Sequence, residues 1–91
     1  MANALFDLTG RRALVTGGGS GLGRGMAEAL GGAGATVALV GRSERVEDAA
    51  RELGGVAVRA DLSDRAELGA AFDRAVEQLG GLDVLVTAHG T

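Results

Sequence analysis

Glycines gather in one short segment of the sequence, Val15-Thr16-Gly17-Gly18-Gly19-Ser20-Gly21-Leu22-Gly23. Backbone without side chains permits a sharp turn with positive φ, and it lets main-chain N–H groups approach a ligand closely. Where a helix begins at such a turn, its N-terminal N–H groups and dipole favour an anion such as a pyrophosphate. The strict G-x-G-x-x-G spacing is absent, whereas Thr16, Gly17, Gly21 and Gly23 give T-G-x-x-x-G-x-G. A purely structural turn in a glycine-rich chain is the alternative.

Arg42 and Ser43 form a second group that can bind an anion, and they follow the apolar run 36–40. A guanidinium holds a phosphate through paired hydrogen bonds, and the Ser43 hydroxyl can add another unless it caps the next helix. The position where an acid would bind a ribose hydroxyl is Gly41, so no carboxylate there repels a phosphate. Glu44 is close enough in sequence to bind a ribose hydroxyl instead, which is one alternative. The other is that Arg42 is a solvated surface charge.

Three acids, Asp61, Asp64 and Glu67, lie near one loop and can serve either catalysis or the start of a helix. Carboxylates are favourable near helix N-termini, where they accept hydrogen bonds from free N–H groups. We therefore expect these acids to cap a helix.

Composition excludes several kinds of chemistry. The 91 residues include 17 Gly, one His and no Cys, Pro, Trp or Tyr, and all nine basic residues are Arg. Disulfides, thiolate metal sites, cysteine nucleophiles, Schiff-base lysines and a Walker A lysine are therefore excluded. The net charge of −3 argues against nucleic-acid binding, which needs clustered positive charge. No apolar run approaches the roughly 20 residues of a membrane span, and the N-terminus lacks a signal-peptide pattern, so we expect a cytoplasmic protein.

Apolar periodicity divides the chain into alternating strands and helices. Near-continuous apolar runs, typical of strands covered on both faces, occur at 12–16, 36–40, 56–59 and 82–87. Three helices are predicted between them, with apolar faces formed by Leu22, Met26, Ala29, Leu30 and Ala33, by Val46, Ala49, Ala50 and Leu53, and by Leu68, Ala71, Phe72, Ala75 and Leu79. Ser43 and Asp64 are the expected N-caps, and Arg24 is expected to face solvent. Strands alternating with helices predict a parallel sheet with right-handed crossovers.

These features together resemble the short-chain dehydrogenases/reductases. The cofactor motif of that family is T-G-x-x-x-G-x-G at the first strand-to-helix turn, as found here. Asp61-Leu62 is similar to the family's Asp-hydrophobe pair, which contacts an adenine ring. Thr87-Ala88-His89-Gly90 stands where the family has N-N-A-G after its fourth strand, and the opening segment 5–11 is also family-like. The resemblance covers essentially the whole chain.

The resemblance implies a Rossmann-like α/β fold, a doubly wound parallel sheet with strand order 3-2-1-4, in one partial domain spanning 1–91. It also implies a nicotinamide cofactor and reversible hydride transfer to or from a small alcohol/carbonyl substrate. Arg42, which stands beside Gly41 where an acid is usual, favours NADP(H) over NAD(H). The expected cofactor-binding residues are Gly17, Gly19, Ser20, Gly21, Leu22, Gly23, Arg42, Ser43, Asp61, Leu62, Ala88 and Gly90.

The departures from the family concern catalysis. Only Gly90 matches the N-N-A-G motif, and His89 is interpreted as a tolerated substitution at the rim of the cleft rather than a catalytic or metal-binding group. The family's chemistry uses a Ser and a Tyr-x-x-x-Lys pair, and this chain has neither Tyr nor Lys. The catalytic half is therefore expected to lie outside these residues. A non-enzymatic NAD(P)-binding module and an inactive interaction fragment are the two alternatives.

Substrate and assembly are the least determined features. Segments 5–11 and 21–27 are similar to family members that act on gluconate or deoxygluconate, but this part of the family does not touch substrate. Full-length members are commonly dimers or tetramers, so a homo-oligomer is expected for a full-length protein. The strand at 82–87 is expected to form an open apolar edge, which predicts marginal stability and self-association of the fragment.

Overall fold

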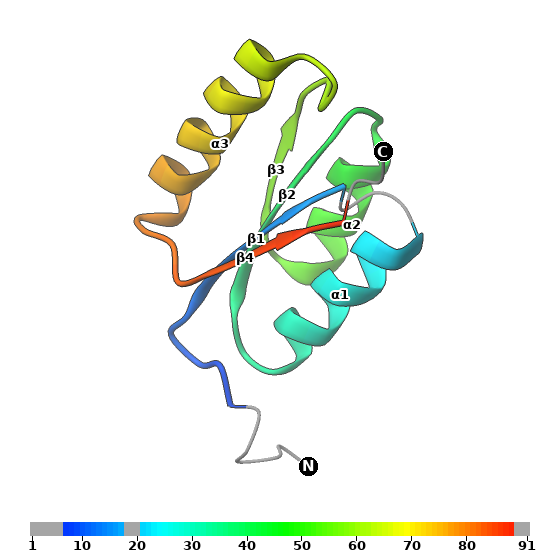
Figure 1. The fold of residues 1–91 in the computed structure, drawn as a ribbon. Coiled ribbons are helices and arrows are strands. Elements are labelled where there is room, and N and C mark those ends of the chain that lie inside the picture. Colours follow the sequence, from blue (N-terminus) through cyan, green and yellow to red (C-terminus); the bar gives the residue numbers. More distant parts are fainter. Residues whose placement is uncertain (1–6, 18–20, 89–91) are drawn as a thin grey trace.

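The computed structural model describes residues 7–17 and 21–88, which form one sheet flanked by helices (Figure 1). In chain order the elements are β1 (Arg12–Thr16), α1 (Gly21–Gly32), β2 (Thr36–Gly41), α2 (Arg45–Leu53), β3 (Val56–Arg59), α3 (Arg65–Leu79) and β4 (Val84–Thr87). The alternation of strands and helices predicted from the sequence is confirmed.

All four strands are parallel, and they lie in the order β3-β2-β1-β4. This confirms the doubly wound arrangement, in which the chain extends the sheet first to one side of β1 and then to the other. Thr16 at the end of β1 lies opposite Val40 on β2 and Thr87 on β4. Gly41 on β2 lies opposite Arg59 on β3. The carboxyl ends of the four strands therefore meet at one edge of the sheet.

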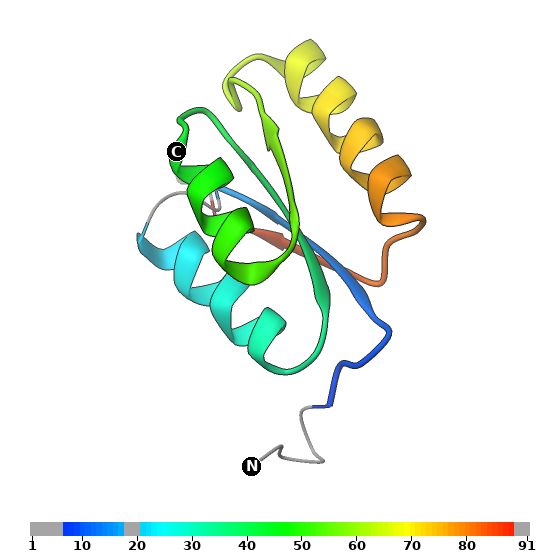
Figure 2. The same cartoon turned by 180° about the vertical axis from the view of Figure 1, so that it is seen from behind.

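Helices cover the two faces of the sheet unequally (Figures 1 and 2). α1 and α2 pack on one face over a first core cluster, which includes Ala13, Val15, Val37, Leu39 and Val46. α3 packs on the other face over a second core cluster, which includes Leu14, Ala38, Val40, Ala71 and Ala75. Successive side chains of a strand point to opposite faces, so β1 and β2 supply both clusters. This two-sided burial accounts for their near-continuous apolar runs.

α1 turns a different stripe toward the sheet from the one predicted. Its buried residues are Gly23 and Ala27, whereas Leu22 is 72% exposed and Met26 40% exposed. Small residues allow the helix backbone to approach the strands closely, so the larger side chains lie on the flank of the helix. The predicted face is therefore wrong for Leu22, Met26 and Ala29, whereas Leu30 packs against the first core cluster as predicted. The spacing of apolar residues did not show that the closest contact would be made by Gly23 and Ala27.

α2 and α3 bury the predicted faces. Val46, Ala49 and Ala50 are buried on α2, and Ala71 and Ala75 are buried on α3. Each helix ends at a glycine with a left-handed backbone, as the sequence predicted.

The two helices begin differently. The Asp64 side chain accepts hydrogen bonds from the backbone N–H groups two and three residues further on, at 3.0 and 3.1 Å, so the predicted cap of α3 is confirmed. The N-cap residue of α2 is Glu44, whose side chain makes no capping bond, rather than the predicted Ser43. Ser43 still contributes from one position earlier, because its Oγ accepts a hydrogen bond from the Arg45 N–H at 3.2 Å.

β4 begins at Val84, two residues later than the predicted run 82–87. Asp83 pairs with the start of β1 instead: its N–H donates to the Arg12 carbonyl at 2.8 Å, and its Oδ2 accepts the Arg12 N–H at 2.9 Å. A carboxylate thus takes the place of a strand carbonyl at this end of the sheet. Residues along β4 alternate between half-buried and exposed, and Leu85 is 50% exposed.

Candidate dinucleotide-binding site

Hydrogen bonds continue the sheet one residue beyond β1 and β4. The Gly17 N–H donates to the Val40 carbonyl at 2.7 Å, and the Ala88 N–H donates to the Thr16 carbonyl at 2.9 Å. The turns that follow neighbouring strands therefore leave the sheet side by side. Chain connections diverge to opposite faces on the two sides of β1, and ligands of open parallel sheets bind at such a switch point.

The turn after β1 has the geometry predicted for the glycine segment. Gly17 has a φ of +79°, a left-handed conformation that residues with side chains rarely adopt. A Cβ added at Gly21, the first residue of α1, would meet no described atom within 4 Å. Gly23 is buried where the helix approaches the sheet. The remaining predicted residues of this group and of the last motif, Gly19, Ser20 and Gly90, lie outside the described residues, as does His89.

Arg42 and Ser43 are exposed in the turn after β2. The turns after β2 and β3 lie side by side, because the Ala60 N–H donates to the Gly41 carbonyl at 2.8 Å. After the hydrogen bonds from Ser63, the positive charge of Arg42 is a further cause that lowers the pKa of Asp61. The Ser43 hydroxyl accepts the Arg45 N–H, and a hydroxyl that accepts one bond retains its own proton to donate to another ligand. Capping and ligand binding therefore do not compete for Ser43.

Asp61 and Glu67 organise the turn after β3. Asp61 Oδ1 accepts hydrogen bonds from the Ser63 Oγ–H at 2.7 Å and the Ser63 N–H at 3.0 Å, and these bonds are the main reason that the pKa of Asp61 lies below its usual range. The Asp61 N–H donates to Glu67 Oε1 at 2.7 Å, while Asp64 caps α3. Asp64 therefore caps the helix as expected, whereas Asp61 and Glu67 stabilise the turn before it. Leu62 is half-buried and packs against the second core cluster.

A hollow of about 480 Å³ opens between α3 and the strands β1 and β4. It is lined by Thr16, Leu85 and Thr87 from the sheet and by Leu68, Gly69 and Phe72 from α3, with Arg65 and Asp73 also contributing. The hollow was not predicted, because Leu68 and Phe72 follow the spacing of ordinary core residues. Thr87, which stands at an Asn position of the sequence motif, therefore faces α3.

Arg24 does not face solvent as expected. Its side chain is only 33% exposed, and its Nε lies 3.4 Å from Glu28 Oε2 on the same helix. The guanidinium also bonds Glu52 on α2, and this contact is the main reason that the pKa of Arg24 is raised. Arg24 thus links the two helices that cover one face of the sheet.

Sequence reasoning missed Arg59, the last residue of β3. Its Nη2 donates to the main-chain carbonyl of Arg42 at 3.4 Å, and its Nη1 lies 3.9 Å from Glu47 Oε1 on α2. A signal was present in the sequence. Val58 belongs to the core on the α3 side, so the alternation of a strand directs the next residue toward α2.

Other kinds of site are not found in the described part of the chain. Residues 7–17 and 21–88 contain no group of three His, Cys, Asp or Glu side chains placed to hold a metal ion. Within the same ranges, no helix has both the length and the apolar character needed to cross a membrane.

Known proteins match this chain in sequence and in structure. A family model described as short chain dehydrogenase matches residues 11–91. Oxidoreductase UcpA of Salmonella typhimurium is 42% identical over an alignment of 88 residues, which covers 91% of this chain and 34% of that protein. The structure of 3-ketoacyl-(acyl-carrier-protein) reductase from Brucella melitensis complexed with NADH matches with a TM-score of 0.79 and 42% identity, over 86% of this chain and 34% of that one.

A second solved structure, the RhlG/NADP active-site complex of Pseudomonas aeruginosa, matches with a TM-score of 0.81 and 40% identity, over 94% of this chain and 37% of that one. The chain spans about a third of the length of the curated relatives it matches. The family model nevertheless covers nearly all of its residues, so the chain belongs to the short-chain dehydrogenase family.

Proposed function

We propose that this chain is the dinucleotide-binding part of a short-chain oxidoreductase that transfers a hydride reversibly between NADP(H) or NAD(H) and an alcohol/carbonyl pair. The observation that carries the proposal is the left-handed Gly17 between β1 and α1, at the point where chain connections diverge to the two faces of the sheet. Family membership supports the class of reaction. The chain has neither Tyr nor Lys, so binding, and not proton transfer by a Tyr-x-x-x-Lys pair, is the role proposed for it.

The first turn of α1 suits the pyrophosphate of a dinucleotide. No acidic residue occurs in that turn, so no carboxylate competes there for the helix N-terminus. Among the described residues, no atom lies within 4 Å of a Cβ added at Gly21, and Leu22 is exposed beside it. These observations support Gly17, Gly21 and Leu22 as cofactor contacts, with Gly23 allowing the helix to approach the sheet.

The turns after β2, β3 and β4 suit the rest of the cofactor. Asp61 and Leu62, which follow β3, are proposed to contact the adenine ring. Ala88, whose N–H donates to the Thr16 carbonyl at the end of β1, is proposed as a further cofactor contact. A bound nicotinamide would supply or accept the hydride. The part played by this chain is to hold and orient the cofactor.

We propose further that the chain prefers NADP(H). Arg42 and Ser43 are both exposed, and both can donate to a 2′-phosphate. Asp61 already accepts two hydrogen bonds from Ser63. Arg42 is therefore not needed as the main partner of Asp61 and can bind a phosphate instead. Glu44, which would favour the 2′-hydroxyl of NAD(H), is an exposed N-cap residue without a capping bond, and NAD(H) is therefore the second candidate cofactor.

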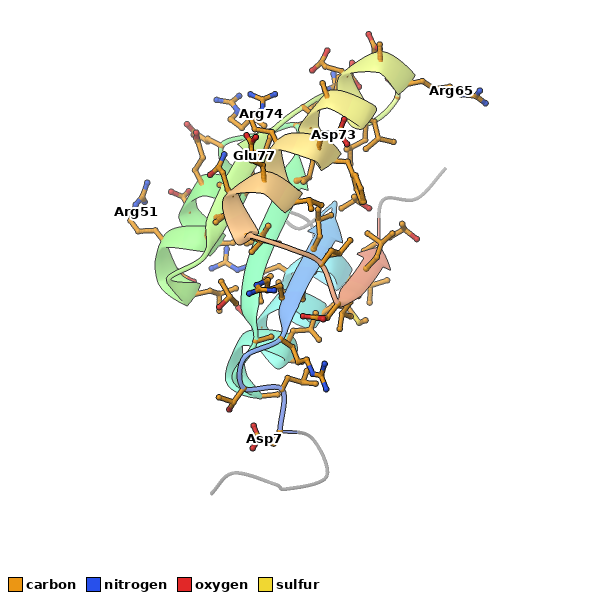
Figure 3. All side chains as sticks on the ribbon, turned by 90° about the vertical axis from the view of Figure 1, so that its left-hand side faces the viewer. Asp7, Arg51, Arg65, Asp73, Arg74 and Glu77 are labelled. Carbon is orange, nitrogen blue, oxygen red and sulfur yellow. The ribbon has the colours of Figure 1, made fainter. Side chains whose placement is uncertain are left out.

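Fluorescence titration of the chain with NADPH and with NADH tests the preference. Arg42→Ala should weaken NADPH binding by about tenfold, the size of a charge-assisted hydrogen bond, and change NADH binding by less than about twofold. Arg74→Ala is the matched control, because Arg74 is an exposed arginine on α3 with the same charge (Figure 3). Equal losses with the two variants would show that only net charge matters. Absence of binding at millimolar cofactor would refute the binding role for this chain alone.

Gly17→Ala tests the pyrophosphate turn. The left-handed backbone makes the substitution unfavourable by about 1–2 kcal/mol, and we expect weaker binding of both NADPH and NADH. Gly10→Ala is the control, since Gly10 has a φ of +84° but precedes β1, at the opposite end of the strand. If Gly10→Ala weakens binding as much as Gly17→Ala, the effect comes from lost stability and not from the turn.

A non-enzymatic NAD(P)-binding module is the second candidate function. In this candidate, the residues proposed to contact the dinucleotide bind it without hydride transfer. The reading frame downstream of Thr91 separates the two candidates. A continuation containing Ser and then Tyr-x-x-x-Lys supports the oxidoreductase, and a stop codon supports the module.

A further inference from the structure

Arg59 ties together three segments at the carboxyl end of the sheet. It ends β3 and lies opposite Gly41, the last residue of β2. Its guanidinium reaches the next turn, where Nη2 donates to the Arg42 carbonyl at 3.4 Å. The other terminal nitrogen, Nη1, lies 3.9 Å from Glu47 Oε1 in the first turn of α2. One side chain therefore bridges β3, the turn after β2 and α2.

The contact to Arg42 is made to the main chain and not to the side chain. The backbone of Arg42 sets the direction in which its own guanidinium leaves the turn, and it carries Ser43 as the next residue. An exposed turn that is held in its binding conformation loses less conformational entropy when a ligand binds. The guanidinium of Arg59 is a planar group with several fixed donors, and Glu47 restricts its orientation.

We propose that Arg59 is a positioning residue that determines how strongly the site prefers a 2′-phosphate. By holding the Arg42 carbonyl, it keeps Arg42 and Ser43 arranged for the phosphate. This inference rests on the proposed preference for NADP(H) and assigns a role to a residue that binds no cofactor itself. A nucleotide without a 2′-phosphate gains little from the same arrangement, so the effect is expected on the preference and not on nucleotide binding in general.

The two fragments 2′,5′-ADP and 5′-AMP isolate this effect, because they differ only in the 2′-phosphate. Their dissociation constants for the 91-residue chain are measured by calorimetry, and the ratio of the two constants reports the preference. Arg59→Met should lower the ratio by about threefold to tenfold, the effect of one hydrogen bond, with 5′-AMP binding unchanged within about twofold. Arg59→Lys should restore most of the ratio, because its ammonium can donate to the same carbonyl.

Two control variants separate positioning by Arg59 from a loss of positive charge and from direct contact with the phosphate. Arg74→Met removes the same charge from an exposed site on α3 and should leave the ratio unchanged. In the Arg42→Met background, Arg59→Met should have less than about a twofold effect on the ratio, because its action passes through the turn that carries Arg42. Amide NMR spectra of each variant establish that the sheet is intact.

The outcomes are distinguishable. A wild-type chain that prefers 2′,5′-ADP, with a ratio unaffected by Arg59→Met, overturns the role of Arg59 and leaves the proposed function standing. An Arg59→Met effect that persists fully in the Arg42→Met background shows direct contact with the phosphate and also overturns positioning. A wild-type chain that binds both fragments equally, or neither, overturns the preference for NADP(H) and this inference with it.

Discussion

β2 and β4 are built from the same kinds of residue but are buried very differently. β2 reads Thr-Val-Ala-Leu-Val-Gly, and every residue after the first is buried. β4 reads Val-Leu-Val-Thr, and its residues alternate between half-buried and exposed. β2 lies between β3 and β1 with helices over both faces, whereas β4 is one of the two edge strands of the described sheet (Figure 2).

The comparison shows that an apolar run predicts a strand but not its coverage. α3 packs mainly over β2 and β3, and the hollow next to β4 opens where the helix does not reach. The proposed cofactor contacts are divided between the two environments. Arg42 follows the well-covered β2, while Asp61 and Ala88 follow the two edge strands, β3 and β4.

Matched truncations of two leucines test the difference most directly. Leu39→Ala on β2 removes a fully buried side chain and should lower the free energy of unfolding by about 2–5 kcal/mol. Leu85→Ala on β4 removes a side chain that is 50% exposed and should cost less than about 1 kcal/mol. Urea denaturation of both variants measures the contrast. Equal losses would mean that β4 is as well covered in solution as β2.

The outer edge of β4 should also control association of the chain. An exposed apolar strand edge is a surface for pairing with another chain, and a lysine on such an edge opposes pairing. We expect Leu85→Lys to raise the dissociation constant of any self-associated species by at least about tenfold, or about 1.4 kcal/mol. Analytical ultracentrifugation measures it. A wild-type chain that stays monomeric at all accessible concentrations would contradict the expected self-association.

The cap of α3 should contribute more stability than the start of α2. Asp64→Ala removes a side chain that accepts two backbone hydrogen bonds, and we expect a loss of about 1 kcal/mol. Glu44→Ala is the control, because Glu44 is an N-cap residue whose side chain makes no such bond, and its effect should be close to zero. Thermal unfolding of the two variants provides the measurement. If the two losses are equal, the capping bonds of Asp64 add nothing in solution.

The smallest expected effect is a change in the titration of Asp61. Hydrogen bonds from Ser63 lower the pKa of this carboxyl in the folded chain. The stability they contribute is present above the unfolded pKa, which is about 3.9, and is lost as the pH falls through the lower folded pKa. Ser63→Ala should therefore raise the pKa of Asp61 toward its ordinary value and reduce the loss of stability in acid. Carboxyl carbon NMR shifts follow the titration.

Asp7 is the internal control for that titration. Its pKa is lowered by hydrogen bonds from Thr9, at the other end of the sheet, and should not respond to Ser63→Ala. A joint shift of Asp7 and Asp61 would indicate a general change in the chain and not the loss of one contact.

Most of the fold could be predicted, because strand formation, turns and helix capping depend mainly on residues that are close in sequence. Apolar runs between glycine turns predicted β1, β2 and β3, and Asp64 marked the start of α3. The misses depend on contacts that are distant in sequence. The exposure of Leu22 depends on how closely α1 approaches the sheet, and the late start of β4 depends on a side-chain bond between Asp83 and a residue 71 positions away.

The features of the candidate site also divide into those that neighbouring residues predict and those that depend on distant contacts. Gly17 and the start of α1 were predictable, since positive φ and helix initiation have signatures in neighbouring residues. The proximity of Arg42 to Asp61 follows once the strand order is known. Strand alternation could have directed Arg59 toward α2, but its contact with the Arg42 carbonyl was not predictable, because a long side chain reaches from the end of β3 to the turn after β2.

Asp83 has a consequence for the opposite end of the sheet. Its two hydrogen bonds to Arg12 fix where β4 begins along β1, and a slip of one residue would turn every β4 side chain to the other face. Thr87 would then leave the hollow beside α3, and Ala88 would no longer lie level with the end of β1. The alignment of the residues at the proposed binding edge therefore depends on the Asp83 carboxylate at the far end of the sheet, because it sets the register of β4 against β1.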